Sequence, residues 1–207
     1  MTRVLYLHGF ASGQGSSKAR YFCEHLRAMG RRVDVPDLAG HDFENLTITG
    51  QLEVIEREAA GEPVVLMGSS MGGYLAALYA GRHPEVEKLV LMAPAFGFAR
   101  RWPEALGEEK VRDWRESGWM EVFHFGDKCR RRVGYSLLED AARYPEYPDF
   151  GQPALIFHGV HDDVVRVRWS EEFAATHSNT RLFVMESDHQ LLDVMDEMMA
   201  RVTEFLN

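Results

Sequence analysis

The chain has 207 residues, enough for one domain with a sizeable core, and its 45% hydrophobic and 27% charged residues are typical of a globular protein. A formal net charge of -9 argues against nucleic acid or an anionic membrane as the main partner. No apolar run approaches the roughly 20 residues of a membrane helix, and the opening MTRVLYLHGF lacks signal-peptide features, so we expect a cytoplasmic location.

Short apolar segments alternate along the chain with segments of helical periodicity. Strands are predicted over 3–9, 31–38, 63–68, 87–94, 153–159 and 181–187, and helices over 16–30, 47–60, 71–83 and 190–206. Strands that are apolar throughout and alternate with helices are typical of a parallel sheet covered on both faces. We therefore predict an α/β fold with about six strands in a mainly parallel sheet, as a single domain over residues 1–207.

Residues 95–152 separate two predicted strands by far more than one crossover helix requires. Long insertions in compact domains are usually lids or binding loops. We predict a lid here, with Trp102, Trp119 and Phe123 as candidate substrate-contacting residues. In the alternative interpretation, the segment is a surface excursion whose aromatic side chains fill a small core of their own.

The stretch GSSMG, residues 68–72, lies where a predicted strand ends and a helix begins. A nucleophile on such a turn needs a strained backbone and small residues two positions to either side. Ser70 has these flanks in Gly68 and Gly72, whereas Ser69 is flanked by methionines. The pattern G-x-S-x-G therefore selects Ser70 as the candidate nucleophile, although a glycine-rich turn with a purely structural role is the alternative.

A serine nucleophile needs a base and an acid that orients the base. Asp162 and Asp163 follow the strand predicted over 153–159, and His189 follows the last predicted strand. These positions place His189 as the base and leave either aspartate as the acid, the other one capping the loop. The backbone N–H groups of Met71 and Phe10 are the predicted oxyanion donors.

A metal site is the competing interpretation of the same region. His158, His161 and the two aspartates could be ligands together with His189, but their spacing matches no zinc motif such as H-E-x-x-H. We therefore expect neither a metal nor another cofactor.

The blocks YLHGFASG, GSSMGG, HGVHDD and SDHQLL, in this order, resemble the α/β-hydrolase superfamily over nearly the whole chain. PDL followed by FENLTITGQL, together with LMAPAFGF, is similar to small bacterial esterases of the YqiA/YcfP kind. The resemblance implies a reduced fold without the first two strands, with a helical lid, and it selects Asp162 through the pattern H-G-x-x-D. Arg166 departs from it, because many relatives carry proline there.

The resemblance further implies hydrolysis of carboxylic esters or thioesters of small to medium acyl groups. A lactonase, an amidase, a C–C hydrolase, a cofactor-free haloperoxidase and a non-catalytic binding protein are the alternatives. A further hypothesis is that arginines of the insertion bind an anionic part of the substrate, namely Arg100, Arg101 and Arg130–Arg132. In the alternative interpretation these arginines form a solvated surface whose charge is balanced by Glu104, Glu108 and Glu109. The oligomeric state is not predicted.

Overall fold

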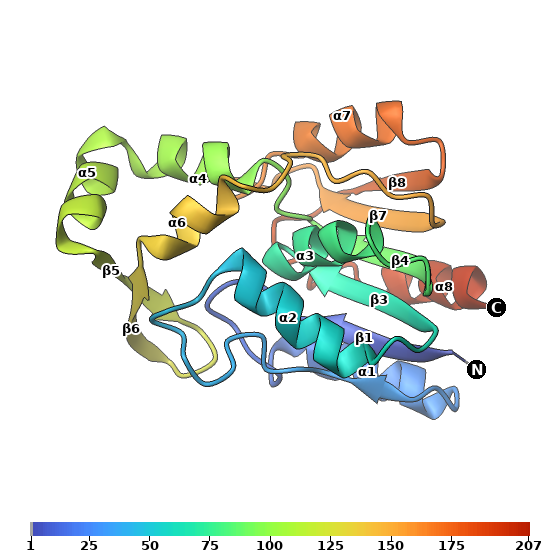
Figure 1. The fold of residues 1–207 in the computed structure, drawn as a ribbon. Coiled ribbons are helices and arrows are strands. Elements are labelled where there is room, and N and C mark those ends of the chain that lie inside the picture. Colours follow the sequence, from blue (N-terminus) through green and yellow to red (C-terminus); the bar gives the residue numbers. More distant parts are fainter. Residues whose placement is uncertain (1) are drawn as a thin grey trace.

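The computed structural model describes residues 2–207, and within them six parallel strands form the main sheet (Figure 1). The strand order is β2-β1-β3-β4-β7-β8, as expected when right-handed crossovers extend a sheet in both directions. The strands are β1 Arg3–Leu7, β2 Val33–Asp34, β3 Val64–Ser69, β4 Val86–Met92, β7 Ala154–Gly159 and β8 Thr180–Met185.

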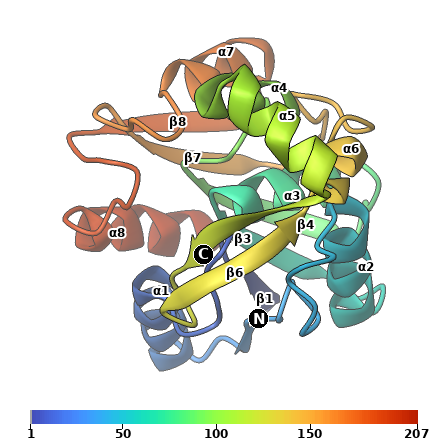
Figure 2. The same cartoon turned by 90° about the vertical axis from the view of Figure 1, so that its left-hand side faces the viewer.

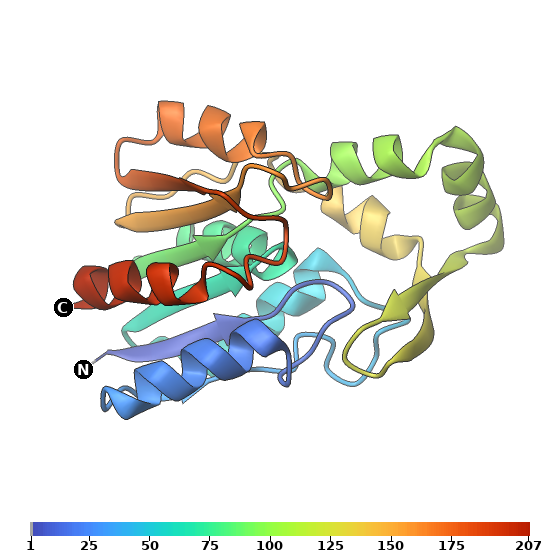
Figure 3. The ribbon, with the colours of Figure 1, turned by 180° about the vertical axis from the view of Figure 1, so that it is seen from behind.

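Helices cover both faces of this sheet, which is why its strands are apolar on both sides. One face packs against α1 Ser17–Ala28 and α8 Met195–Leu206, which lie together in Figure 3. The other face packs against α2 Ile48–Ala59, α3 Met71–Ala80 and α7 Arg168–Thr176. Each face buries its own hydrophobic cluster, so every central strand contributes side chains to two cores.

The predicted strands and helices are present, but several of them begin or end at other residues than predicted. The first two helices begin after N-cap side chains, since Ser16 accepts from Ala19 N–H and Thr47 accepts from Gly50 N–H. Strand β2 has only two residues instead of the predicted 31–38. Helix α8 starts five residues later than predicted, because residues 190–194 belong to the loop that carries His189. Helix α7 was not assigned from the sequence.

The insertion between β4 and β7 contains helices and also a β-hairpin that the sequence did not predict. Its elements are α4 Phe98–Leu106, α5 Glu108–Ser117, β5 Trp119–His124, β6 Cys129–Gly134 and α6 Ser136–Ala141. In Figure 2 this segment lies in front of the sheet, at the end where the parallel strands finish. The buried Trp114 side chain anchors it, donating its indole N–H to Val133 O (3.0 Å).

Besides sharing the hydrophobic cluster on one face of the sheet, the insertion is attached to the sheet layer by hydrogen bonds. Phe125 N–H donates to Ala11 O (2.7 Å), and Gly134 N–H donates to Glu44 O (2.7 Å). The third attachment is a buried carboxylate, Asp140 on α6, which accepts from both the backbone N–H and the hydroxyl of Thr49 (both 2.7 Å). Because Thr49 lies in the first turn of α2, Asp140 satisfies one of the free N–H groups of that helix.

Within residues 2–207, none of the helices combines the length and the apolar character that crossing a bilayer requires.

Candidate active site

Ser70 lies on the turn that joins β3 to α3. Its φ of 52° and ψ of −114° place a non-glycine residue in a strained conformation, which points its side chain out of the turn. Three backbone N–H groups hold its carbonyl, from Gly73 (3.0 Å), Tyr74 (3.1 Å) and Ala95 (3.0 Å). The surrounding structure therefore fixes this strained geometry.

The glycines on either side of Ser70 are required by close backbone approach. A Cβ on Gly68 would lie 2.2 Å from Gly72 O, and a Cβ on Gly72 would lie 2.0 Å from Leu7 O. Both distances are far below contact and involve backbone atoms, which have little room to move. The small residues of the G-x-S-x-G pattern thus allow α3 to start directly against β1 and β3.

The structure brings Ser70, His189 and Asp162 together, although Ser70 and His189 are 119 residues apart in sequence. His189 Nδ1–H donates to Asp162 Oδ2 (2.7 Å), which leaves Nε2 as an acceptor for the Ser70 hydroxyl (3.2 Å). The His189 side chain is 11% exposed and that of Asp162 is fully buried. Such a chain of three groups can transfer the serine proton to the imidazole and stabilise the resulting charge.

The Asp162 carboxylate is almost fully hydrogen-bonded. Oδ1 accepts from the N–H groups of Val164 (2.9 Å) and Val165 (2.7 Å), and Oδ2 also lies 3.1 Å from His158 Nε2. Burial alone would raise the pKa of this carboxyl. The hydrogen bonds from His158, His189 and Val165 N–H outweigh burial and hold the pKa well below its usual range.

Asp163 is exposed, and the loop bonds expected of it are made by Asp162. One aspartate thus both orients His189 and shapes its own loop.

His158 was missed as a supporting residue. It is fully buried, accepts from the Ser170 hydroxyl at Nδ1 (2.7 Å), and shares its Nε2–H between Val165 O (2.7 Å) and Asp162. Its partner Ser170 is twelve residues away, so the strand-end position of His158 was the only signal available from the sequence. Among residues 2–207, no group of three or more His, Cys, Asp or Glu side chains is arranged to hold a metal ion.

The loop that carries His189 is fixed from several directions. Asp188 Oδ1 accepts from the N–H groups of Gln190 (2.7 Å) and Leu191 (3.3 Å). Leu191 is fully buried, with a φ of 54°, and the hydroxyl of Ser187 donates to Asp193. A short turn stabilised by a carboxylate and a buried side chain leaves the imidazole little freedom to move.

A buried lysine lies against the same loop. Lys18 on α1 is 8% exposed, and its ammonium donates to His189 O (3.5 Å). Burial lowers the pKa of this ammonium to about 8, while the charges of Asp162 and Asp188 act in the opposite direction. Helical periodicity did not single out Lys18, because long charged side chains usually extend to solvent.

The two predicted oxyanion donors lie at the start of α3 and in the loop after β1. Met71 is the first residue of that helix, where N–H groups have no acceptor within the helix. Among residues 2–207, the backbone N–H groups of Met71 and Phe10 donate to no backbone carbonyl through a turn, loop or cap hydrogen bond. His8 braces the loop by donating from Nδ1 to Gly9 O (3.0 Å) and accepting from Leu38 N–H (3.5 Å). Two free donors near Ser70 are what an oxyanion requires.

A family model supports the sequence resemblance. The model of the uncharacterised protein family UPF0227 matches residues 3–207. The chain belongs to the UPF0227 family. The UPF0227 chain is also similar to mouse monoacylglycerol lipase ABHD6, at 24% identity over an alignment 232 residues long, which covers 89% of the chain and 68% of the lipase.

Solved structures show the α/β-hydrolase fold for this UPF0227 chain. Est1E from Butyrivibrio proteoclasticus, with ferulic acid bound, matches with a TM-score of 0.82 and 20% identity over 100% of the chain and 88% of Est1E. Mouse alpha/beta hydrolase domain-containing protein 10 matches with a TM-score of 0.78 and 20% identity over 98% of the chain and 88% of that protein. The predicted fold class is therefore confirmed.

The three aromatic residues predicted to contact substrate lie in different surroundings. Trp102 on α4 packs edge-on against the Phe10 ring (5.2 Å between centroids), so it borders the loop after β1, which carries the predicted oxyanion donor Phe10 and is called the oxyanion loop below. Phe123 is 49% exposed and packs against Phe125 near the end of the hairpin. Of the three, only Trp102 contacts a loop that carries a predicted site residue.

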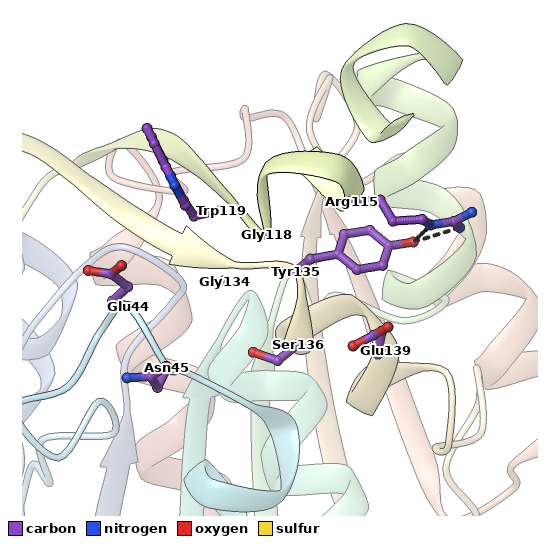
Figure 4. A pocket seen from close by; sticks show the side chains of 9 residues that line it. All are labelled: Glu44, Asn45, Arg115, Gly118, Trp119, Gly134, Tyr135, Ser136 and Glu139. Carbon is purple, nitrogen blue, oxygen red and sulfur yellow. Dashed lines mark hydrogen bonds between the residues drawn. The ribbon is translucent and has the colours of Figure 1, made fainter. Parts of the chain in front are cut away.

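Trp119 lines a separate hollow of about 350 Å³ at the base of the hairpin (Figure 4). Its ring lies under the Arg132 guanidinium, 3.9 Å from the centroid. The hollow is also bordered by Glu44, Glu139 and the Arg115–Tyr135 hydrogen bonds drawn in the figure. Trp119 thus belongs to the structure of the insertion, and no contact connects it with Ser70.

Proposed function

We propose that this protein is a serine hydrolase that cleaves carboxylic esters or thioesters of small to medium acyl groups. The observation that carries the proposal is the hydrogen-bonded series from Ser70 Oγ through His189 to the buried Asp162. The strained turn at Ser70 and the similarity to a monoacylglycerol lipase support it further. The substrate is a small molecule, and the chemistry of these groups needs no cofactor.

In the proposed mechanism, His189 removes the Ser70 proton as the hydroxyl oxygen attacks the carbonyl carbon. Asp162 keeps the imidazole in the reactive tautomer and stabilises the imidazolium. The N–H groups of Phe10 and Met71 bind the negative oxygen of the tetrahedral intermediate. His189 then protonates the leaving alkoxide or thiolate, which yields an acyl-enzyme on Ser70.

Water completes the cycle. His189 removes a proton from the water as it attacks the acyl-enzyme, and the second tetrahedral intermediate collapses to release the acid and the free Ser70 hydroxyl. The insertion, with Trp102 against the oxyanion loop, is proposed to act as the lid that encloses the acyl group.

Intact-mass measurement after treatment with a fluorophosphonate probe tests this proposal. We expect one adduct on the wild type and none on Ser70→Ala, because only a serine with an adjacent base reacts with the probe. Hydrolysis of short acyl esters should fall by at least about 10³-fold in the same variant. An adduct that survives in Ser70→Ala, or a folded wild type without any adduct, would contradict the proposal.

A further inference from the structure

The arginines of the insertion differ in how their charges are compensated. Arg100 pairs with Glu146 (3.0 Å) and stacks on Trp169, with 4.9 Å to the ring centroid. The hairpin arginines also have partners: Arg130 faces Glu121 (3.9 Å), Arg131 pairs with Asp127 (2.5 Å) and Arg132 covers Trp119. The glutamates expected to balance this face, Glu104, Glu108 and Glu109, form none of these pairs.

Arg101 on α4 differs from these, because among the described residues it has neither a carboxylate nor an aromatic ring beside its guanidinium. Among the residues that the structure describes, no carboxylate lies within 4 Å of its guanidinium. Its one hydrogen bond goes from Nη1 to Val164 O (2.8 Å), and its buried Nε has no acceptor. A guanidinium has five N–H donors, and protein groups accept from one of those of Arg101.

The surroundings of Arg101 place this free charge beside the active site. Val164, its acceptor, also donates its N–H to Asp162 (2.9 Å). The next residue of α4, Trp102, packs against Phe10 in the loop after β1. The first turns of α4 therefore contact the Asp162 loop through Arg101 and the oxyanion loop through Trp102.

Asp162 does not neutralise Arg101. Both of its oxygens are taken by two backbone N–H groups and two histidines. Burial lowers the pKa of the Arg101 guanidinium, and the negative charge of Asp162 opposes that shift from a distance. A partly desolvated guanidinium without an ion partner is unfavourable, so a ligand that supplies an anion there would gain a strong, charge-assisted contact.

We propose that Arg101 binds an anionic group, a carboxylate or a phosphate, of the substrate whose ester or thioester carbonyl is attacked by Ser70. This inference rests on the proposed function and adds a substrate class to it. Substrates would then be recognised at two places, the carbonyl by the oxyanion donors and the anion by a planar fork that suits carboxylate and phosphate oxygens.

Two matched substrate pairs test the inference and distinguish the source of the anion. Methyl hexanoate and monomethyl adipate differ by a terminal methyl against a carboxylate. S-butyryl-N-acetylcysteamine and butyryl-CoA share an acyl group and the cysteamine thiol, and CoA continues on the thiol side into the rest of pantetheine and a phosphorylated adenosine. For each pair, the quantity measured is the ratio of kcat/KM for the anionic member to that for the neutral member.

We expect the wild type to favour the anionic member of at least one pair by about tenfold or more. Arg101→Gln, which keeps an N–H donor for Val164 O but removes the charge, should lower that ratio by about 10- to 100-fold, mainly through KM. Arg101→Lys should retain part of the ratio. Arg100→Gln is the matched control, since Arg100 is already paired with Glu146, and it should leave the ratio near the wild-type value.

Other results would overturn the inference. If Arg101→Gln lowers kcat equally on all four substrates, Arg101 only holds the Asp162 loop. If the ratios are unchanged, or if the wild type takes the fluorophosphonate on Ser70 but hydrolyses none of the four, the anion site is wrong and the hydrolase proposal stands. If the wild type takes no label, the proposed function fails first.

Discussion

The loops that carry Ser70, Asp162 and His189 are built differently from the insertion that faces them. Each of the three loops follows a parallel strand and is fixed by backbone contacts, as where a Cβ on Gly72 would meet Leu7 O at 2.0 Å. The insertion surrounds Trp114 with aromatic side chains, extends the hydrophobic cluster on one face of the sheet, and adds a few hydrogen bonds to the loops below it. Under the proposed function, the sheet would fix the reacting groups and the insertion would determine which molecules reach them.

The largest expected effect is a loss of kcat on substitution of Asp162, the predicted acid in one of the loops that follow the parallel strands. Asp162→Asn should lower kcat by about 10³-fold, because the amide no longer holds His189 in the reactive tautomer. Its neighbour provides the control: Asp163→Asn changes an exposed side chain and should retain activity within about twofold. Steady-state kinetics on a short acyl ester measures both. Equal losses in the two variants would mean that the hydrogen bonds of Asp162 have no special role.

The second prediction concerns the stability of the same region. The pKa of Lys18 is about 8 in the folded protein, below its ordinary value of 10.5. Between pH 8 and pH 10.5 the unfolded chain therefore binds more protons than the folded one, and the free energy of unfolding rises with pH. The penalty for burying the ammonium is therefore fully present below about pH 8. Lys18→Met should raise the free energy of unfolding at pH 7, on the order of 1–3 kcal/mol, and the gain should shrink by pH 9.5.

Urea unfolding at both pH values measures this effect. Lys88→Met is the matched control, because Lys88 also donates to a backbone carbonyl, that of Phe205 (2.6 Å), but is only half-buried. A Lys18→Met variant that is no more stable than the wild type at pH 7 would show that the buried ammonium is compensated in the fold.

The smallest expected effect lies in the insertion. Asp140→Ala removes the carboxylate that joins α6 to the first turn of α2, and should lower the free energy of unfolding by about 1–2 kcal/mol. Limited proteolysis should then cut within residues 98–141 faster than in the wild type. Glu139→Ala, an exposed neighbour, is the control. If Asp140→Ala lowers the free energy of unfolding but residues 98–141 are cut no faster than in the wild type, this attachment does not hold the insertion in place.

The same two regions also differ in how far the sequence predicts them. The central strands were predicted to within about two residues, because strands buried on both faces form apolar runs bounded by glycine or proline. The tight turn at Ser70 was predicted from its flanking glycines, since steric exclusion depends only on local sequence. The grouping of Ser70, Asp162 and His189 followed from their positions after strands of one parallel sheet.

What the sequence did not predict depends on contacts between distant residues. The hairpin of the insertion pairs Trp119 with Gly134, and its alternation is weak because both of its faces carry polar side chains. Lys18 and His158 reach Asp162 or the His189 loop only after the sheet has formed. Arg100 and Arg101 are adjacent in sequence, and the sequence alone does not show that Arg100 pairs with a carboxylate and Arg101 does not.

The 119-residue separation between Ser70 and His189 has a consequence for synthesis of the chain. Helix α3, the turn at Ser70 and the oxyanion loop are all made well before β8 and the loop that follows it. A nascent chain of which only the first two-thirds have left the ribosome therefore contains Ser70 without its hydrogen-bond partner His189. Under the proposed function, Ser70 would become reactive only when the last strand joins the sheet and the loop after it brings His189 into place.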